Sequence, residues 1–357
     1  MKKSLLAAAA LTAFVGAASA QSSVTLFGIL DVDARSVSNG SAGSLKTLST
    51  NGQASSRLGF RGIEDLGGGL KAGFWLEGDI SPDTGGGNKT TSGTGNTADP
   101  MTWTRRATVS LLGGFGEIRL GRDYTTTFNN LVTYDMYNYV GVSSIANIRS
   151  VLGSGAGTAV RANNTISYFL PALGGLYGQA EVAAGEQTTG NKFVGGRLGY
   201  AAGPLNVSGA YGKTYKTGTM LDDETTVNVG ASFNAGFLTV QGTLEKVKYN
   251  GLGQKLASIG TLIPIGAGTI KLNYTKASGQ SNTAAVAGNT FGATLLGAGY
   301  VYDLSKRTSI YVGYGRIQNA GDPVLGGGKF TASSGGPAGI KAGETSTGYD
   351  LGIRHNF

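Results

Sequence analysis

The sequence contains no cysteine and a single histidine, His355, in its 357 residues. The lack of cysteine excludes a disulfide-rich scaffold and any metal centre built on thiolates. One histidine leaves little for a transition-metal site, or for a hydrolase whose serine needs an adjacent base. We therefore expect no enzyme, no cofactor and no metal ion. Calcium at the carboxylates of residues 222–224 is an alternative that the composition leaves open.

Long apolar runs are also missing. After residue 20 the chain has no stretch of about 18 apolar residues, so a helical membrane protein is excluded. Charged residues make up only 14%, and the 62 glycines lack the repeat of collagen. Sixteen tyrosines and thirteen phenylalanines argue against disorder. This composition indicates a glycine-rich β protein.

Signals for nucleic acid are absent as well. The formal net charge is +8, but the basic residues are scattered and no DNA-binding motif accompanies them. The glycine runs 67–69 and 85–87 lack the following helix pattern and the Lys-Ser/Thr pair of a phosphate-binding loop. We expect no nucleic-acid partner.

The amino terminus reads as an export signal. Lys2 and Lys3 precede a short apolar stretch over 5–18, and Ala18-Ser19-Ala20 forms a small-residue cleavage site. The expected organisation is a signal peptide over 1–20 and one exported domain over 21–357.

Alternation with a period of two is typical of strands whose two faces meet different surroundings. Near the start, Val24 and Leu26 share one parity, whereas Asp31 and Arg35 share the other. Similar alternation recurs along the chain and at its end. We expect strands of about ten residues, which suffices for a tilted strand to cross a bilayer.

Turn signals divide these strands into hairpins. Short turns are expected at 64–69, 113–116, 171–175, 201–204, 234–236, 264–268 and 303–306. Longer polar segments alternate with them, at 36–55, 79–102, 123–163, 186–191, 217–222, 251–254, 279–291 and 318–344. These fifteen connections predict a 16-stranded antiparallel transmembrane β-barrel with short periplasmic turns and long extracellular loops. All seven prolines fall in the expected connections, as an unbroken strand ladder requires.

Specific strings then resemble those of a known family. The segments 23–28, 56–67, 105–111, 116–122 and 352–357 are similar to strands of Gram-negative trimeric general porins, and most of all to the anion-selective porins of β-proteobacteria. The resemblance implies a homotrimer in the outer membrane, in contact with lipid and lipopolysaccharide. It also implies a third loop, 123–163, folded into the lumen. Small anionic or hydrophilic solutes are the implied cargo.

The same resemblance suggests site residues. Positions matching the wall arginines of the family are Arg57, Arg106 and Arg161, and strand parity points Arg57 and Arg61 inward because Leu58 would face outward. Arg122, Arg149 and Arg119 are lesser candidates for the pore constriction, and Arg35 and Lys271 are expected to add to the positive field of the lumen. The alternative for each is a rim side chain paired with a loop carboxylate or with lipopolysaccharide. Phe357 is the expected signal for the outer-membrane insertion machinery, or an aromatic residue at the lipid interface.

The third loop is poor in acid. Asp135 is its only carboxylate between Tyr124 and Asn163, so a positive constriction and anion selectivity are predicted. Its aromatic residues are expected to pack against the wall, with a stacking path for solutes as the alternative. The runner-up function is an adhesin or surface antigen, because the loops 79–102 and 318–344 are long and rich in Gly, Ser and Thr.

Overall fold

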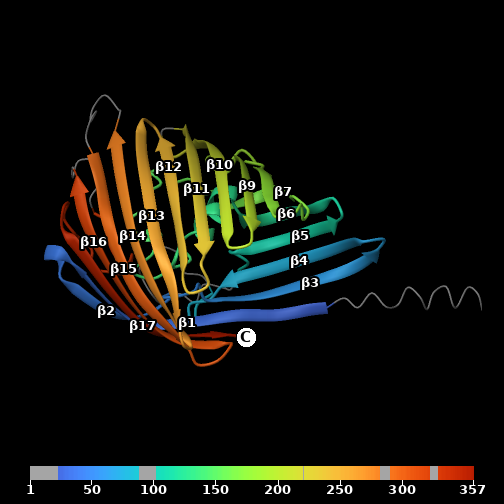
Figure 1. The fold of residues 1–357 in the computed structure, drawn as a ribbon. Helices are drawn as coiled ribbons and strands as arrows, with labels where there is room; N and C mark the ends of the chain where they lie inside the picture. Colours follow the sequence, from blue (N-terminus) through green and yellow to red (C-terminus); the bar gives the residue numbers. More distant parts are fainter. Residues whose placement is uncertain (1–22, 88–101, 220, 282–289, 322–328) are drawn as a thin grey trace, which may run out of the picture.

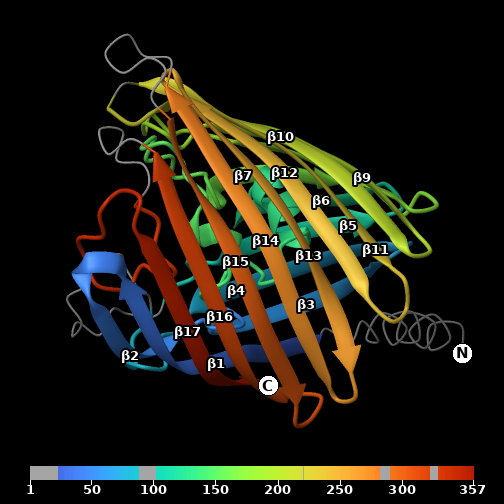
Figure 2. The same ribbon diagram turned by 60° about the vertical axis from the view of Figure 1, so that its left-hand side comes forward.

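The computed structural model describes residues 23–87, 102–219, 221–281, 290–321 and 329–357. The expected signal peptide lies outside these residues. The described strands form one closed barrel, seen from two sides in Figures 1 and 2. The strands are β1 (Ser23–Asn39), β2 (Ser44–Thr50), β3 (Arg57–Gly67), β4 (Leu70–Asp79), β5 (Arg106–Gly113), β6 (Gly116–Tyr124), β7 (Arg161–Phe169), β8 (Leu176–Ala183), β9 (Phe193–Ala202), β10 (Leu205–Thr217), β11 (Asp222–Asn234), β12 (Thr239–Tyr249), β13 (Leu252–Ile265), β14 (Gly268–Ser281), β15 (Thr290–Asp303), β16 (Thr308–Gly321) and β17 (Thr345–Asn356). The helical segments are η1 (Gly40–Ala42), α2 (Thr126–Thr133) and η2 (Ile145–Asn147).

The barrel closes through β1, which pairs antiparallel with β17 along 29–39. On its other edge β1 pairs first with β3 and then with β2. Because β2 and β3 follow one another beside the same strand, the labelled strands fill sixteen positions in the wall. The predicted 16-stranded antiparallel barrel is confirmed. The segment 36–55, expected to be a loop, instead contains the end of β1 and all of β2.

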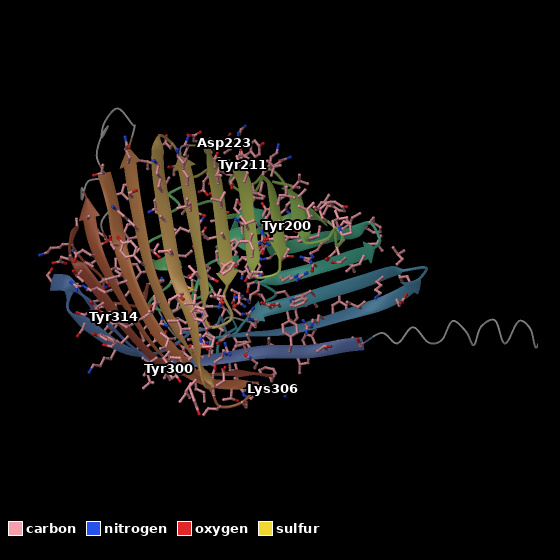
Figure 3. All side chains as sticks on the ribbon, in the orientation of Figure 1. Tyr200, Tyr211, Asp223, Tyr300, Lys306 and Tyr314 are labelled. Carbon is pink, nitrogen blue, oxygen red and sulfur yellow. The ribbon has the colours of Figure 1, made fainter. Side chains whose placement is uncertain are left out.

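The two rims differ in their connections. The seven predicted short turns are all present, and the shortest, of two residues each, join β3 to β4, β5 to β6, β9 to β10 and β13 to β14. We call their side the turn rim and the opposite side the loop rim; in Figure 3 Lys306 marks the first and Asp223 the second. On the loop rim, only Asn250 and Gly251 separate β12 from β13, so this connection is shorter than predicted.

One proline departs from the prediction. Pro264 lies within β13, where it is in register with Thr269 of β14. The position tolerates proline because the pairing of β13 with β12 has already ended at Leu262. The missing amide therefore breaks no ladder on that side.

The wall has an apolar outer face and a polar inner face. On β1, Val24 and Leu26 are 66% and 53% exposed, whereas Asp31 and Asp33 are buried inside. The predicted parity of the first strand is therefore confirmed. No helix among the described residues is both long and apolar enough to cross a membrane.

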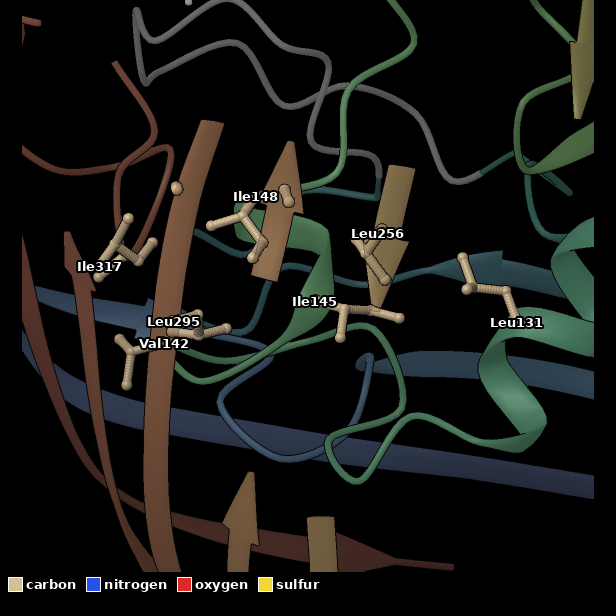
Figure 4. Packing of buried hydrophobic residues seen from close by; sticks show 10 residues of the cluster. Leu131, Val142, Ile145, Ile148, Leu256, Leu295 and Ile317 are labelled. Atoms are coloured by element: carbon tan, nitrogen blue, oxygen red, sulfur yellow. The ribbon is translucent and has the colours of Figure 1, made fainter. Parts of the chain in front are cut away.

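The largest buried apolar cluster lies inside the barrel. Figure 4 shows Val142, Ile145 and Ile148 of the third loop packed against Leu295 and Ile317 of β15 and β16. Each fully buried side chain of this size contributes roughly 1.5–3 kcal/mol. Hydrophobic burial therefore holds the third loop against the wall.

Candidate functional site: the channel lumen

The third loop runs from Tyr124, at the end of β6, to Arg161, at the start of β7, and begins with helix α2. The helix lies against the inner faces of β8–β11. Asn130 donates from Nδ2 to Oδ1 of Asn228 on β11, at 2.9 Å. The hydroxyl of Tyr134 is 2.7 Å from that of Ser208 on β10. These side-chain bonds fix the first third of the loop to one side of the barrel.

The middle of the loop reaches the far side of the barrel. The amide of Val142 donates to Oδ2 of Asp350 on β17, at 3.1 Å. Ser143 donates from Oγ to the carbonyl oxygen of Tyr314 on β16, at 2.6 Å. The loop therefore lines the inner wall from β8 to β17, and the inner faces of β3–β6 remain open to the lumen.

Glycines on the inner face give the loop room to approach. A Cβ at Gly230 of β11 would overlap the ring of Tyr134. A Cβ at Gly315 or Gly348, on β16 and β17, would overlap Val142. Inward parity of these glycines is visible in the sequence, and it is the signal that could have located the seat of the loop.

Two predicted constriction residues are buried in this packing. Arg149 forms an ion pair with Glu245 of β12, at 2.5 Å, and both side chains are nearly inaccessible. Asp135 accepts hydrogen bonds from the amides of Tyr137 and Tyr139, at 3.2 and 2.8 Å. Burial raises the pKa of the Asp135 carboxyl, and these bonds oppose the shift. Neither residue presents a free charge to the lumen.

The aromatic residues of the loop serve mainly in packing. Phe128, Tyr134 and Tyr137 are buried. Phe128 stacks on Tyr124 and meets Tyr139 edge-on, with centroid distances of 4.9 and 5.0 Å. This agrees with the expected packing role, because buried rings offer solutes no stacking surface.

The open wall of β3–β6 carries a cluster of arginines and carboxylates. Arg57 pairs with Glu77 of β4 at 3.2 Å. Arg105 pairs with the same carboxylate at 2.5 Å and with Asp79 at 2.8 Å. It also donates to the hydroxyl of Tyr124, at 2.8 Å. The cluster thus begins beside the entry to the third loop.

The cluster continues toward the turn rim. Arg106 lies 3.4 Å from Asp123, which also accepts from Arg119 at 2.7 Å. Arg119 binds Glu117 at 2.8 Å as well. These four residues lie close together because all of them occupy inward-facing positions on the paired strands β5 and β6. The register of the pair, in which Ser110 is opposite Arg119, brings these positions side by side.

Aromatic rings support the guanidinium groups. The guanidinium groups of Arg61 and Arg106 lie over the ring of Trp75, with their central carbons 5.0 and 4.5 Å from the ring centroid. Arg119 lies 4.1 Å from the ring centroid of Phe169. Cation–π contact of this kind stabilises each group by about 0.5–2 kcal/mol. It holds the cations in place without neutralising them.

The remaining predicted arginines are placed as follows. Arg161 stacks on Tyr124, 4.4 Å from its centroid, and donates to its hydroxyl at 2.8 Å. Arg122 is in register with Ala107, on the face of β5 that turns outward, and donates to the carbonyl oxygen of Thr104 and to Asn163. Arg161 therefore borders the cluster, and Arg122 lies apart from it.

The two further cations on the inner wall are covered. Arg35 pairs with Asp33 and Asp350, at 3.1 and 2.6 Å. Lys271 is buried under the third loop and donates to the carbonyl oxygen of Met136, at 3.2 Å. These cations anchor the interior and are not presented to a solute.

The exposed fractions of the arginine and carboxylate side chains show which charges the open wall presents to the lumen. The side chains of Arg57, Arg106 and Arg119 keep 24%, 19% and 15% of their exposure. Glu77 and Asp123, which pair with them, keep only 7% and 5%. Arg57 and Arg106 thus lie nearer the lumen surface than their partners, whereas the carboxylates Glu117 and Asp79 keep 19% and 29% and remain accessible.

Several members of this cluster were not singled out from the sequence. They are Arg105, Glu77, Asp79, Glu117, Asp123 and Trp75. Parity on β4 and β6 places the carboxylates and the tryptophan inside, so that signal was available. Arg105 gave no such signal, because it precedes β5. Across the described ranges no group of three or more His, Cys, Asp or Glu residues is arranged to hold a metal ion.

Comparison with known proteins shows which family this barrel resembles. The family model for Gram-negative porins matches residues 7–322. The outer membrane porin protein 32 of Delftia acidovorans is 39% identical, with both chains covered completely. The major outer membrane protein P.IB of a Neisseria meningitidis serogroup A strain is 29% identical, again over the whole of both chains.

Solved structures agree with this result. An anion-selective porin from Comamonas acidovorans superposes with a TM-score of 0.79 and 35% identity, covering 94% of this chain and 100% of that one. The trimer form of OmpT from Vibrio cholerae has a TM-score of 0.65 and 16% identity, covering 94% and 99%, which supports the fold alone. On the family match and the Delftia relative, the chain belongs to the Gram-negative porins, which are outer-membrane channels.

Proposed function

We propose that the chain is a passive channel for small hydrophilic solutes that prefers anions, with Arg57 and Arg106 as the main carriers of selectivity. The greater exposure of Arg57 and Arg106 than of their carboxylate partners Glu77 and Asp123 is the observation that supports it. Positive potential focused in a narrow passage raises the local concentration of anions. The Comamonas relative is described as anion-selective.

The test is the reversal potential of the purified protein in a planar bilayer under a KCl gradient. A potential of the sign set by chloride supports the proposal, and a potential set by potassium overturns it. A bilayer that stays silent, with correctly folded protein, would favour the adhesin alternative.

A homotrimer is the proposed assembly. The outward residues Val24, Leu26, Leu351 and Ile353 give β1 and β17 an apolar outer face, which suits either lipid or a second subunit. The OmpT relative is described in a trimer form. Three equal conductance steps per insertion event would support the trimer, and single steps would contradict it.

Processing and insertion complete the proposal. Residues 1–20 are proposed to be a signal peptide, so the intact mass of protein from the outer membrane should correspond to a chain beginning at Gln21. Phe357 is proposed to be read by the insertion machinery. Outer-membrane lipid and lipopolysaccharide are the proposed surroundings of the barrel.

A further inference from the structure

Four lysines form a patch on the outer face of the barrel near the loop rim. Lys246 and Lys248 lie on β12, Lys255 on β13 and Lys276 on β14, and all four are exposed. Val247, between the first two, is buried inside the barrel. The lysines therefore point away from the lumen, and their side chains do not line the channel. We call these four residues the lysine patch.

The patch holds like charges close together. Lys246 and Lys255 are direct cross-strand partners. Lys255 is in register with Ser278, two residues from Lys276, so the third strand adds its charge diagonally. Like charges in opposed positions destabilise a sheet. A bound anion would relieve this repulsion.

Protein carboxylates do not neutralise the patch. Among the residues that the structure describes, none of its four lysines forms an ion pair. Lys213 of the neighbouring β10 shows the contrast, because it binds Asp223 at 2.7 Å. Tyr211 and Asp223, labelled in Figure 3, mark this part of the loop rim. The four lysines of the patch are thus free cations, and they lie beside Lys213 and Asp223, which neutralise each other.

The surface around the patch is hollowed into two adjoining grooves. The upper groove, of about 830 Å³, includes all four lysines in its lining, and Asp222 and Asp223 at its edge, of which Asp223 is paired with Lys213. The lower groove, of about 740 Å³, is lined mainly by apolar side chains, among them Val229, Leu244 and Ile259. Lys276 lines both grooves. A charged hollow therefore continues directly into an apolar one.

The boundary between the two grooves follows one level of the barrel. Below Lys246 the next outward residue on β12 is Leu244, and below Lys276 the next on β14 is Tyr274. Both are exposed apolar or aromatic residues of the lipid-facing band. Lysines immediately above such a band lie at the depth of lipid headgroups.

We propose that the lysine patch and the apolar groove below it bind a phosphorylated lipid of the outer leaflet. Its headgroup phosphates bind the lysines through charge-assisted hydrogen bonds, and its acyl chains fill the apolar groove. The proposal rests on the lipid and lipopolysaccharide surroundings proposed above and gives them a binding site, and it does not depend on the selectivity of the channel.

The test uses the full barrel refolded in detergent that is free of lipopolysaccharide. Bisphosphorylated lipid A is titrated in, and bound lipid is counted by native mass spectrometry. The variant K246Q/K255Q should bind roughly 25-fold more weakly, at about fivefold per lysine. The control K306Q/R307Q removes two exposed cations from the turn rim and should bind as the unmodified chain does.

Three outcomes would overturn the proposal. They are equal affinity in K246Q/K255Q, equal binding of lipid A without its phosphates, and displacement of lipid A by inorganic phosphate, which would indicate a simple anion site. Single-channel conductance should be unchanged in the variant, because the patch lies outside the lumen. That measurement confirms folding and separates the lipid site from the function of the pore.

Discussion

Gly28 and Phe357 close the barrel seam. Each donates its amide to the carbonyl of the other, both at 3.0 Å, and the ring of Phe357 covers the space where a side chain on Gly28 would lie. The last residue of the chain is therefore paired through its backbone as well as placed at the outer surface.

This pairing gives the terminal residue a testable double role. Phe357→Ala keeps both backbone bonds and removes only the ring. If the ring is a signal for insertion, the amount of folded protein in the outer membrane should fall severalfold, while refolding in detergent is preserved. Phe237→Ala, which truncates another exposed aromatic residue in a turn, is the control. An equal loss in cells and in detergent would show that the ring acts on stability alone.

Arg106 tests the origin of selectivity. Arg106→Gln removes a lumen cation and leaves its tryptophan support and the Arg119–Asp123 pair in place. A unit charge about 4 Å from a passing ion in water contributes about 1 kcal/mol. The anion-to-cation permeability ratio should therefore fall by up to about fivefold. Reversal potentials measure the change, and Arg307→Gln in the turn rim should leave them unaltered. An unchanged ratio in Arg106→Gln would place selectivity elsewhere.

Because the third loop packs against inward-facing glycines, we expect that a larger side chain at one of them changes the pore size. In Gly230→Val the new side chain displaces the ring of Tyr134, and the loop moves toward the lumen. Overpacking of this kind destabilises by about 1–3 kcal/mol. Conductance should fall and its noise should rise. Gly196→Val places the same side chain on β9, where only the carbonyl oxygen of Gln179 is near, and should conduct normally. Normal conductance in both variants would contradict the inference that glycine at position 230 is what lets the third loop pack against the wall.

The buried pair Arg149–Glu245 predicts a stability effect. Arg149→Leu leaves a buried carboxylate whose only remaining described partner is Asn228. Loss of one member of such a pair costs about 3–5 kcal/mol. Thermal unfolding should show a lower Tm in the single variant, and the double variant R149L/E245L should recover much of the loss. If the double variant were no better than the single one, the pair itself would be the source of stability.

Strands and turns were predictable because both signals are local. Alternation on β1 and the turn chemistry at Gly203–Pro204 need no knowledge of distant residues. The strand β2 was missed because its two leucines, Leu45 and Leu48, are three residues apart and so fall on opposite faces, which leaves no alternating apolar face. Pro264 was misjudged because its tolerance depends on where the neighbouring strand ends.

The site was predictable only in part, for a physical reason. Arg57 and Arg106 follow from parity, but the direction of Arg105 is set by Glu77 and Asp79 on another strand. The burial of Arg149 depends likewise on Glu245, 96 residues away along the chain. Such choices depend on tertiary contacts that no local pattern encodes.

The division of the inner wall between the third loop and the arginine cluster makes pore width and pore charge independent traits. Width depends on how closely the loop sits against β8–β17, which is set by the size of side chains at seats such as Gly230 and Gly348. Charge depends on β3–β6. One glycine replaced by a larger residue narrows the passage and keeps its charge, and one arginine replaced by a neutral residue lowers the positive charge and leaves the third loop in place. A bacterium can therefore adjust solute size and solute charge by mutations on opposite sides of the same barrel.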